Sequence, residues 1–289
     1  MHLRSLYDDP KPTISFEYFP PKSAEAEATL VNETTPGLLK LNPAYISITY
    51  GAGGGTRDST LRIATRLRKE YGVEPLMHFT CVGSTREQLS DYLNEARLIG
   101  LENVLALRGD PPKGQSTFEA TAGGFAHATD LIRFIKSRGD YCIAAACYPE
   151  GHVESRFKHD DWDRAAEKVK NGAEFLISQL FYDWSDYLDM IEYLKVKHEV
   201  NVPIIPGILP FQGAEQIKRF TSLCGAKLPK PLRDKLEAHA QDEEAVRQIG
   251  VEVCTELCLR LLDHKAPGFH FYCLNRVASV TQIVKNLGL

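Results

Sequence analysis

The chain has 289 residues, of which 43% are hydrophobic, a formal net charge of −4 and a pI near 6.2. This length permits one large core, and no Ser/Gly-rich linker interrupts it, so we expect a single domain over residues 1–289. The charge argues against a general nucleic-acid or membrane-surface binder, and no apolar run approaches the roughly 20 residues of a membrane helix. Seven cysteines without a CxxC pair, behind an N-terminal segment without an apolar signal, indicate a cytoplasmic protein. Cys254 and Cys258, four apart on a predicted helix, are interpreted as core thiols.

Eight apolar, β-branched runs recur along the chain and alternate with helical patterns. The runs cover residues 14–19, 45–50, 76–81, 104–107, 142–148, 175–181, 204–209 and 269–274. The helical patterns lie at about 24–40, 57–71, from 84 onward, 125–138, 161–171, 185–198, within 213–264 and at 276–287. Strands that alternate with helices predict a parallel sheet, and eight such units predict an α/β fold of the (β/α)8 TIM-barrel class.

In a barrel of this class the active site lies at the carboxyl ends of the strands, so the polar residues there are the candidate functional residues. They are Glu17, Thr49, His78, Arg108, Asp110, Tyr148, Glu150, His152, Gln179, Tyr272 and Arg276. The first strand has no His-x-His zinc pair, the sixth has no Schiff-base lysine, and no Gly-x-Ser-x-Gly elbow occurs. Acids, amides and aromatic rings without these devices indicate that a bound organic cofactor supplies the difficult chemistry.

Glu17 stands between Phe16 and Tyr18 in the first predicted strand. A carboxylate in apolar surroundings is costly unless it is paired or protonated, and a protonated one can serve as a general acid. The structural alternative, a glutamate on the solvent face of a strand, is weak because helices cover the outside of a barrel.

Other candidates also have structural alternatives. Arg108 could bind a ligand, or it could pair with Asp110 and hold its loop. His78 could contact a ligand or be a satisfied histidine of the barrel, and His270 is expected to fill the barrel interior. Gln179, if buried, needs partners for both ends of its amide, which suits recognition of a heterocycle edge.

A glycine-rich stretch at residues 51–56 follows the second predicted strand. A dinucleotide-binding turn needs a third glycine for helix packing and an acidic residue about 20 positions later. Thr56 takes the place of that glycine, and Glu70 and Glu74 precede the next strand, so we disfavour a Rossmann fold. A nucleotide-cradling loop at a barrel strand end remains open, and the polar loop up to residue 122 is long enough to be functional.

Segments spread over nearly the whole chain resemble the methylenetetrahydrofolate reductase family, in the family's order. They are FEYFPPK at 16–22, SITYGA at 47–52, HFTC at 78–81, LALRGD at 105–110, YPEGH at 148–152, QLF at 179–181, PGILP at 206–210 and FHFYCLN at 269–275. The resemblance implies a flavin-containing (β/α)8 barrel, which agrees with the strand count.

The resemblance also implies a ping-pong reaction in which NADH or NADPH reduces a bound FAD and leaves, and methylenetetrahydrofolate then takes its place and accepts the hydride. It implies that Glu17 is the general acid and that Asp110 lies near flavin and pterin. For the substrates it points to Gln179, Phe220, Tyr272 and Arg276.

For FAD, the family pattern points to ten positions. They are Thr49, His78, Arg108, Gly109, Asp110, Ala146, Tyr148, His152, Asp161 and Lys168. Arg108, His152 and Lys168 suit the phosphates or the ribose, because these groups favour cationic and hydrogen-bonding partners. Tyr148 offers a flat surface to a ring.

The chain departs from the family pattern at Met77, Cys147 and Ser178, where proline, a small residue and threonine are more usual. None of these changes removes a reactive group. Larger relatives carry a C-terminal domain that binds S-adenosylmethionine as an inhibitor; the chain ends after the predicted barrel, so we expect no such regulation. We also expect a homo-oligomer, as in bacterial relatives, without nucleic-acid or membrane partners.

Two other functions are compatible with the same fold. A flavin-free enzyme could pass hydride directly from nicotinamide to folate, although retention of the residues that match the flavin site argues against it. A folate-binding subunit of a methyl-transfer complex is the second alternative, and retention of Glu17 disfavours it because a pure binder needs no acid.

Overall fold

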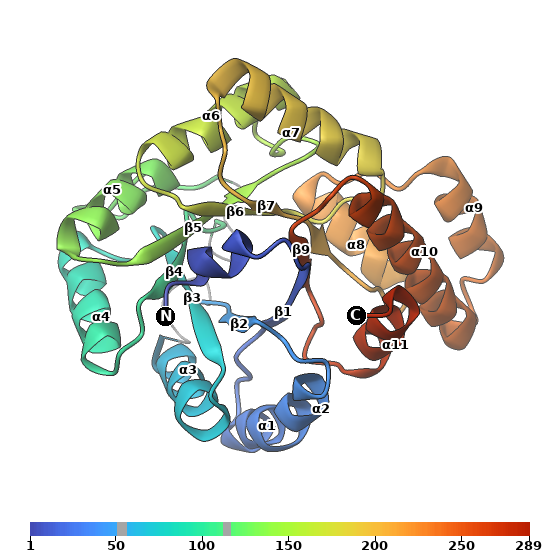
Figure 1. The fold of residues 1–289 in the computed structure, drawn as a ribbon, viewed down its shortest axis with the longest axis horizontal. Coiled ribbons are helices and arrows are strands. Elements are labelled where there is room, and N and C mark those ends of the chain that lie inside the picture. The colour runs from blue at the N-terminus through green and yellow to red at the C-terminus, as the bar shows by residue number, and fades with distance from the viewer. Residues whose placement is uncertain (51–56, 112–116) are drawn as a thin grey trace.

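A computed structural model describes residues 1–50, 57–111 and 117–289. Parallel strands form a barrel, and helices surround it (Figure 1). The strands are β1 Thr13–Tyr18, β2 Tyr45–Ile48, β3 Glu74–Thr80, β4 Asn103–Leu107, β5 Cys142–Cys147, β6 Phe175–Ser178, β7 Ile204–Ile205, β8 Gly207–Ile208 and β9 Gly268–Phe271. Their order is β7-β6-β5-β4-β3-β2-β1-β9-β8. This arrangement confirms the predicted (β/α)8 barrel and excludes the Rossmann alternative.

The seventh barrel strand is divided at Pro206, which explains why the structure has nine strands where eight were predicted. β7 pairs with β6, whereas β8 pairs with β9, so the two halves bond to opposite neighbours. Pro206 has no N–H to give to the ladder, but its carbonyl accepts the His270 N–H at 3.0 Å. β7 and β8 stand at the two ends of the strand order, so the chain that passes through Pro206 connects these two ends.

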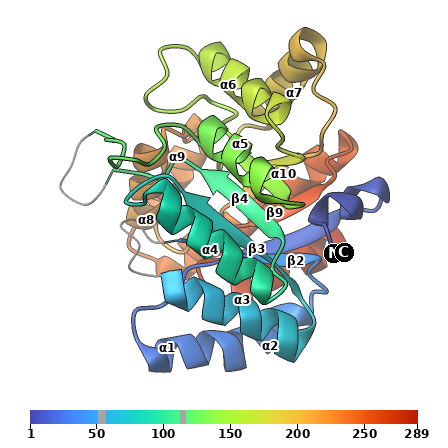
Figure 2. The same cartoon turned by 90° about the vertical axis from the view of Figure 1, so that its left-hand side faces the viewer.

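The helices pack on the outside of the barrel, as Figure 2 shows for α3, α4 and α5. They are the 3-10 helix η1 Leu3–Asp8, α1 Ala24–Thr29, the π-helix η2 Leu30–Thr34, α2 Thr35–Leu39, α3 Arg57–Tyr71, α4 Arg86–Leu98, α5 Ala128–Arg138, α6 Lys158–Lys170, α7 Trp184–His198, α8 Ala214–Cys224, α9 Lys230–Ala238, α10 Glu243–Asp263 and α11 Ala278–Leu287. The segment 213–264, predicted to be helical, consists of the three helices α8, α9 and α10.

Local sequence explains where several helices begin. Thr85 caps α4, since its hydroxyl accepts the Gln88 N–H at 3.2 Å and the Gln88 side chain accepts the Thr85 N–H at 2.9 Å. The single helix predicted over residues 24–40 is wrong in detail, because a π turn divides it. Pro36 falls in the first turn of α2, where a missing N–H costs no helical bond.

The amino end of the barrel is closed by the N-terminal segment. Leu3 is fully buried there, and its N–H donates to the Asn103 side chain at 2.9 Å. It packs with a layer of barrel side chains that includes Tyr45, Leu76 and Phe175. In Figure 1, η1 lies across this end of the barrel. Because this end is filled, the carboxyl ends of the strands are the end available for a ligand.

Six of the seven free cysteines are buried. Cys254 and Cys258 of α10 are both buried, as predicted. Among the described residues, no group of three or more histidine, cysteine or acidic side chains is placed to hold a metal ion. The described helices include none with the length and hydropathy needed to cross a membrane.

Candidate functional site

Glu17 lies in the barrel interior, with its side chain directed at two histidines. It is 6% exposed on β1, and its Oε2 lies 3.4 Å from His78 Nε2 of β3 and 3.7 Å from His270 Nε2 of β9. The sheet register explains the meeting, since Glu17 is paired with Ser47 of β2 and Ser15 with His270. The predicted burial of Glu17 is confirmed, and the structural alternative of a solvent-facing glutamate is wrong.

The two histidines have different surroundings. His270 is held by the hydroxyls of Ser15, at 2.8 Å, and Ser47, at 3.2 Å, so it fills the interior as predicted. His78 Nε2 has no hydrogen-bond partner among the described residues. Burial lowers the pKa of His78 to about 4, although the nearby Glu17 carboxylate opposes the change. The ring is therefore neutral near pH 7.

Ser15 and Ser47 were not among the predicted site residues. Their signal in the sequence was the two-residue spacing that places Ser15 on the same strand face as Glu17, and Ser47 on the same face as Thr49. Both are buried polar residues, and each finds its partner in His270. They fix the orientation of an imidazole that lies beside the candidate acid.

Tyr272 and Gln179 occupy the side of the mouth formed by β6, β8 and β9. The Tyr272 hydroxyl donates to the Ser178 carbonyl at 2.7 Å. Gly207 makes this contact possible, because a Cβ atom there would come within 2.2 Å of that carbonyl oxygen and 2.6 Å of the Tyr272 hydroxyl. Gln179 is half-buried, and its side-chain oxygen accepts the Leu180 N–H at 2.8 Å. One end of the Gln179 amide therefore has a backbone partner, and recognition of a heterocycle edge stays a prediction.

Arg108 pairs with a residue that sequence reasoning missed. Its guanidinium holds the Glu154 carboxylate at 2.5 and 2.9 Å and lies 4.9 Å from the centre of the Phe118 ring. The alternative that Arg108 pairs with Asp110 is therefore wrong; Asp110 is exposed. Gly109 between them has φ +88°, a left-handed conformation that glycine adopts without steric cost.

A second cluster, which contains positively and negatively charged side chains, lies at the exit of β5. Lys168 of α6 donates to the Ala146 carbonyl at 2.7 Å, and its ammonium lies 5.7 Å from the centre of the Tyr148 ring. Tyr148 in turn contacts the His152 ring edge-on, with 4.9 Å between the ring centres. Burial lowers the pKa of Lys168 and raises that of Asp161 to about 6. Burial likewise lowers the pKa of His152, with a further contribution from Arg108.

This cluster has the donor and acceptor set that a dinucleotide needs. Arg108 and Lys168 can face phosphate oxygens, and Tyr148 can face a ring. Asp161 Oδ2 is buried and has no hydrogen-bond partner among the described residues, so it can accept a hydrogen bond from a ribose hydroxyl. The residues present therefore fit a flavin dinucleotide.

The remaining predicted residues make none of the contacts described above. Thr49 is half-buried just after β2, and Phe220 is half-buried on α8 and packs against the core. Arg276 is exposed before α11, and no ion pair or side-chain hydrogen bond joins it to the described part of the site. The glycine-rich stretch 51–56 and residues 112–116 of the polar loop lie outside the described residues, so the nucleotide-cradling hypothesis stays a prediction.

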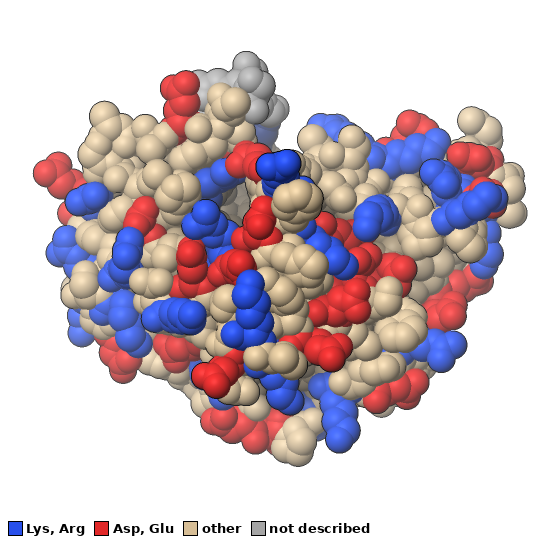
Figure 3. Space-filling model, turned by 90° about the horizontal axis from the view of Figure 1, so that it is seen from above, with Lys and Arg blue, Asp and Glu red and all other residues tan. Residues whose placement is uncertain are grey.

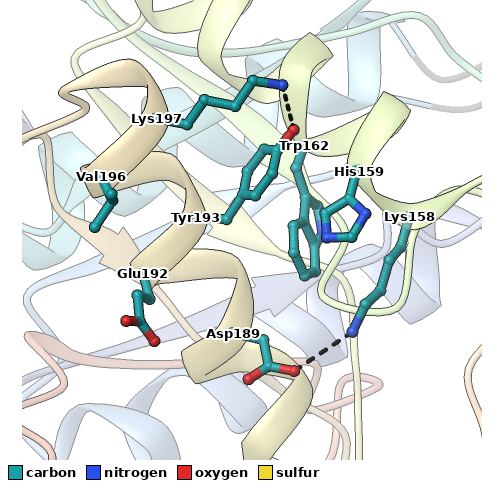
Figure 4. A pocket seen from close by; sticks show the side chains of 8 residues that line it. All are labelled: Lys158, His159, Trp162, Asp189, Glu192, Tyr193, Val196 and Lys197. Carbon is teal, nitrogen blue, oxygen red and sulfur yellow. Dashed lines mark hydrogen bonds and ion pairs between the residues drawn. The ribbon is translucent and has the colours of Figure 1, made fainter.

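A groove also lies on the outer side of the barrel, between α6 and α7, where Trp162, Tyr193 and His159 pack together (Figure 4). None of its lining residues stands at a strand end, so it is not the candidate active site. Figure 3 shows that Lys and Arg are interspersed with Asp and Glu over one face of the molecule, without a broad basic patch.

Comparisons with known proteins support one family. The family model described as methylenetetrahydrofolate reductase matches residues 2–288. The chain is 37% identical to "Methylenetetrahydrofolate reductase (NADH) 1" of Arabidopsis thaliana, over 99% of this chain and 50% of the plant protein. It is 33% identical to "5,10-methylenetetrahydrofolate reductase" of Salmonella typhimurium, over 96% of this chain and 90% of the bacterial protein.

The fold has a solved counterpart as well. A Clostridium thermocellum protein, described as binding two copies of 5-methyl-5,6,7,8-tetrahydrofolic acid, superposes with a TM-score of 0.66 at 15% identity, over 98% of this chain and 96% of that one. At this identity the likeness concerns the fold. The chain spans about half the length of the plant and yeast relatives it matches. From the match over residues 2–288 and the bacterial relative matched over most of its length, the chain belongs to the methylenetetrahydrofolate reductase family.

Proposed function

We propose that this chain reduces 5,10-methylenetetrahydrofolate to 5-methyltetrahydrofolate with NADH or NADPH, through a bound FAD, and that residues 1–289 act as one catalytic domain. The observation that carries the proposal is the buried carboxyl group of Glu17, which faces a neutral His78 at the carboxyl ends of the strands. Membership of the family supports the choice of substrate. The plant relatives are named as NADH enzymes, so NADH is the donor to try first.

FAD, when bound, would supply the hydride-carrying chemistry between nicotinamide and the methylene carbon of folate, so that the reaction divides into two half-reactions of a ping-pong scheme. The part of the protein is to bind, orient and move one proton. Glu17 would donate that proton to the folate nitrogen that leaves the methylene carbon, which opens the bridge to an electrophilic iminium. A neutral His78 does not compete as an acid, because its pKa lies near 4.

The other site residues would orient the substrate and the cofactor. Gln179 would hydrogen-bond the pterin edge, and Asp110 would lie near pterin and flavin. Phe220 would contact both substrates in turn, and Tyr272 and Arg276 would line the folate side. The flavin would be held by residues at the exits of β2 to β5 and by two residues of α6. These residues are Thr49, His78, Arg108, Gly109, Asp110, Ala146, Tyr148, His152, Asp161 and Lys168.

The visible spectrum of the purified protein, before and after anaerobic NADH, tests the proposal. A yellow protein with absorbance near about 450 nm that bleaches with NADH, and regains colour with methylenetetrahydrofolate, is the expected result. A protein that stays colourless when FAD is supplied would overturn the flavin assignment. The flavin-free reductase and the folate-binding subunit would then be the functions to test.

A further inference from the structure

Glu150, in the loop after β5, is a buried carboxylate to which neither the fold nor the proposed reaction gives a task. Its side chain is 5% exposed. Both of its carboxylate oxygens lie 3.1 Å from the backbone nitrogen of Lys227, which donates its N–H to them. Lys227 belongs to the loop between α8 and α9, so the contact joins segments that are far apart in the sequence.

The contact fastens the end of α8 to the mouth of the barrel. α8 ends at Cys224, and Gly225 follows in a left-handed conformation, so Lys227 stands just beyond the helix. A Cβ atom on Gly225 would come within 2.7 Å of Val153 in the β5 loop, which shows how closely the two segments approach. The same helix carries Phe220, one turn before its end.

A crevice marks the place where these segments meet the candidate site. Its lining residues come from the exits of β5 and β6 and from the end of α8. They are Tyr148, Pro149, Glu150, Gly151, Gln179, Leu180, Cys224 and Ala226. Because Gln179 and Tyr148 line the same crevice, a displacement of the α8 end changes the surroundings of two candidate site residues.

The charges around Glu150 come from three neighbouring elements. Lys227 Nζ lies 3.9 Å from both Glu150 and Asp186 of α7. Lys158 of α6 lies 3.4 Å from Asp186 and from Asp189, and the second of these pairs is drawn in Figure 4. Asp183, the N-cap of α7, and the half-buried thiol of Cys224 also face this cluster.

Burial raises the pKa of Glu150 to about 7, and the Lys227 amide acts against that increase. A neutral amide oxygen could accept the same N–H with a smaller desolvation cost. A carboxylate makes the bond stronger when ionised and makes it depend on pH. Glu150 also lies near the carboxyl end of α8, where the helix dipole disfavours an anion and so favours the protonated form.

We propose that Glu150 is a positioning residue, which holds the Lys227 amide and thereby keeps the end of α8, with Phe220, in place at the mouth of the site. The inference rests on the proposed function, because the contact of Phe220 with substrate is part of it. Glu150 acts through backbone and does not touch the reacting atoms.

Three variants of the FAD-loaded enzyme test the role. Glu150→Ala removes both acceptors, Glu150→Gln keeps the shape and one acceptor, and Glu237→Gln makes the same charge change at an exposed position of α9. For each, we would measure the exchange rate of the Lys227 amide hydrogen, KM and kcat for methylenetetrahydrofolate, and the flavin content.

In Glu150→Ala we expect the Lys227 amide to exchange about tenfold faster and KM to rise about tenfold, as the loss of a charge-assisted hydrogen bond predicts. Flavin content and kcat should change less than about twofold, and Glu150→Gln should show smaller effects in the same direction. In the native chain KM should rise as the pH falls through about 7, since protonation weakens the acceptor. The Glu150→Gln enzyme should lack this dependence, and Glu237→Gln should keep it.

Faster exchange at Lys227 with an unchanged KM would overturn the inference, because the tether would then be structural only. An unchanged exchange rate in Glu150→Ala would overturn it as well. The exchange measurement does not depend on turnover, so a native chain that lacks reductase activity would refute the proposed function without affecting the tether. If Glu150→Ala does not fold, the comparison of Glu150→Gln with Glu237→Gln decides.

Discussion

Glu17 Oε2 and His78 Nε2 lie 3.4 Å apart in the barrel interior, on strands separated by β2. Burial holds the pKa of His78 near 4, so at neutral pH the imidazole places no positive charge beside the carboxyl group. An uncharged neighbour suits a proton donor, because an adjacent cation would favour the ionised carboxylate. The pair therefore links the packing of three barrel strands to the acid that the proposed reaction requires.

Glu17→Gln should separate the two half-reactions. The amide keeps the size of the side chain but cannot donate the proton that opens the methylene bridge. We expect folate turnover to fall by about 10²- to 10⁴-fold, while NADH still bleaches the flavin. Stopped-flow absorbance of each half-reaction measures this directly. If both half-reactions survive, the assigned role of Glu17 is wrong.

His78→Gln should change how the free energy of unfolding depends on pH. The folded pKa is about 4 and the unfolded value is 6.5, so between these values the unfolded chain binds more protons. Stability of the native chain should therefore fall as the pH drops through this window, by on the order of 3 kcal/mol in full. Urea unfolding at about pH 7.5 and at about pH 5 measures this change. Between the two pH values the free energy of unfolding should fall less for the variant than for the native chain.

The comparison must be between the two proteins at each pH, because other groups titrate in the same window. Asp161 and Glu150 have pKa values raised by burial to about 6 and about 7, which gives them the opposite sign. Both groups are present in the native chain and in His78→Gln, so their effects cancel in the difference. Equal pH dependence of the two proteins would show that His78 is not the titrating group.

Gly207→Ala should disturb the corner formed by β6, β8 and β9. The added methyl group would meet the Ser178 carbonyl oxygen at 2.2 Å and the Tyr272 hydroxyl at 2.6 Å, and a backbone atom cannot move away cheaply. We expect a loss of about 1–3 kcal/mol in the free energy of unfolding, together with weaker folate binding. Gly213→Ala is the control, since nothing lies within 4 Å of its new methyl group and an N-cap change costs at most about 1 kcal/mol. Equal melting temperatures for the two variants would contradict this account.

Asp161→Asn should weaken the binding of FAD. The carboxylate is buried, one of its oxygens has no partner within the described residues, and Lys168 stabilises its charge. Removal of a charged acceptor should raise the dissociation constant of FAD about tenfold, measured by quenching of flavin fluorescence. Asp160→Asn, at the exposed neighbouring position of α6, should leave it unchanged. Tighter or unaltered binding in Asp161→Asn would mean that the orphaned oxygen faces something other than the cofactor.

The same affinity should depend on pH. Because the pKa of Asp161 is about 6 in the protein without ligand, the acceptor is ionised above this value and protonated below it. FAD should therefore bind more weakly as the pH falls below about 6, and the dependence should be smaller in Asp161→Asn. A dissociation constant that is flat from about pH 5 to about pH 8 in the native chain would count against an ionised Asp161 as the acceptor.

Many elements of the fold could be predicted because their signals are local. Apolar, β-branched runs identified the barrel strands, and the polar residues at 84–87 identified the start of α4. The π turn between α1 and α2 and the division of the seventh strand at Pro206 could not be predicted, because each depends on how neighbouring elements pack. A proline signals that a ladder bond is missing, but not which neighbour each half will choose.

By itself the sequence determined which side chains stand at strand ends, because the apolar runs stop there. It also determined which of them share a strand face, because side chains alternate with a two-residue period. Glu17, His78 and Tyr272 were identified in this way. Only the tertiary structure decided the partners. Arg108 pairs with Glu154 rather than with nearby Asp110, and Ser47 meets His270 from the far end of the chain. Such pairs depend on the register and closure of the barrel, which bring distant residues within hydrogen-bond distance, and no local pattern specifies that geometry.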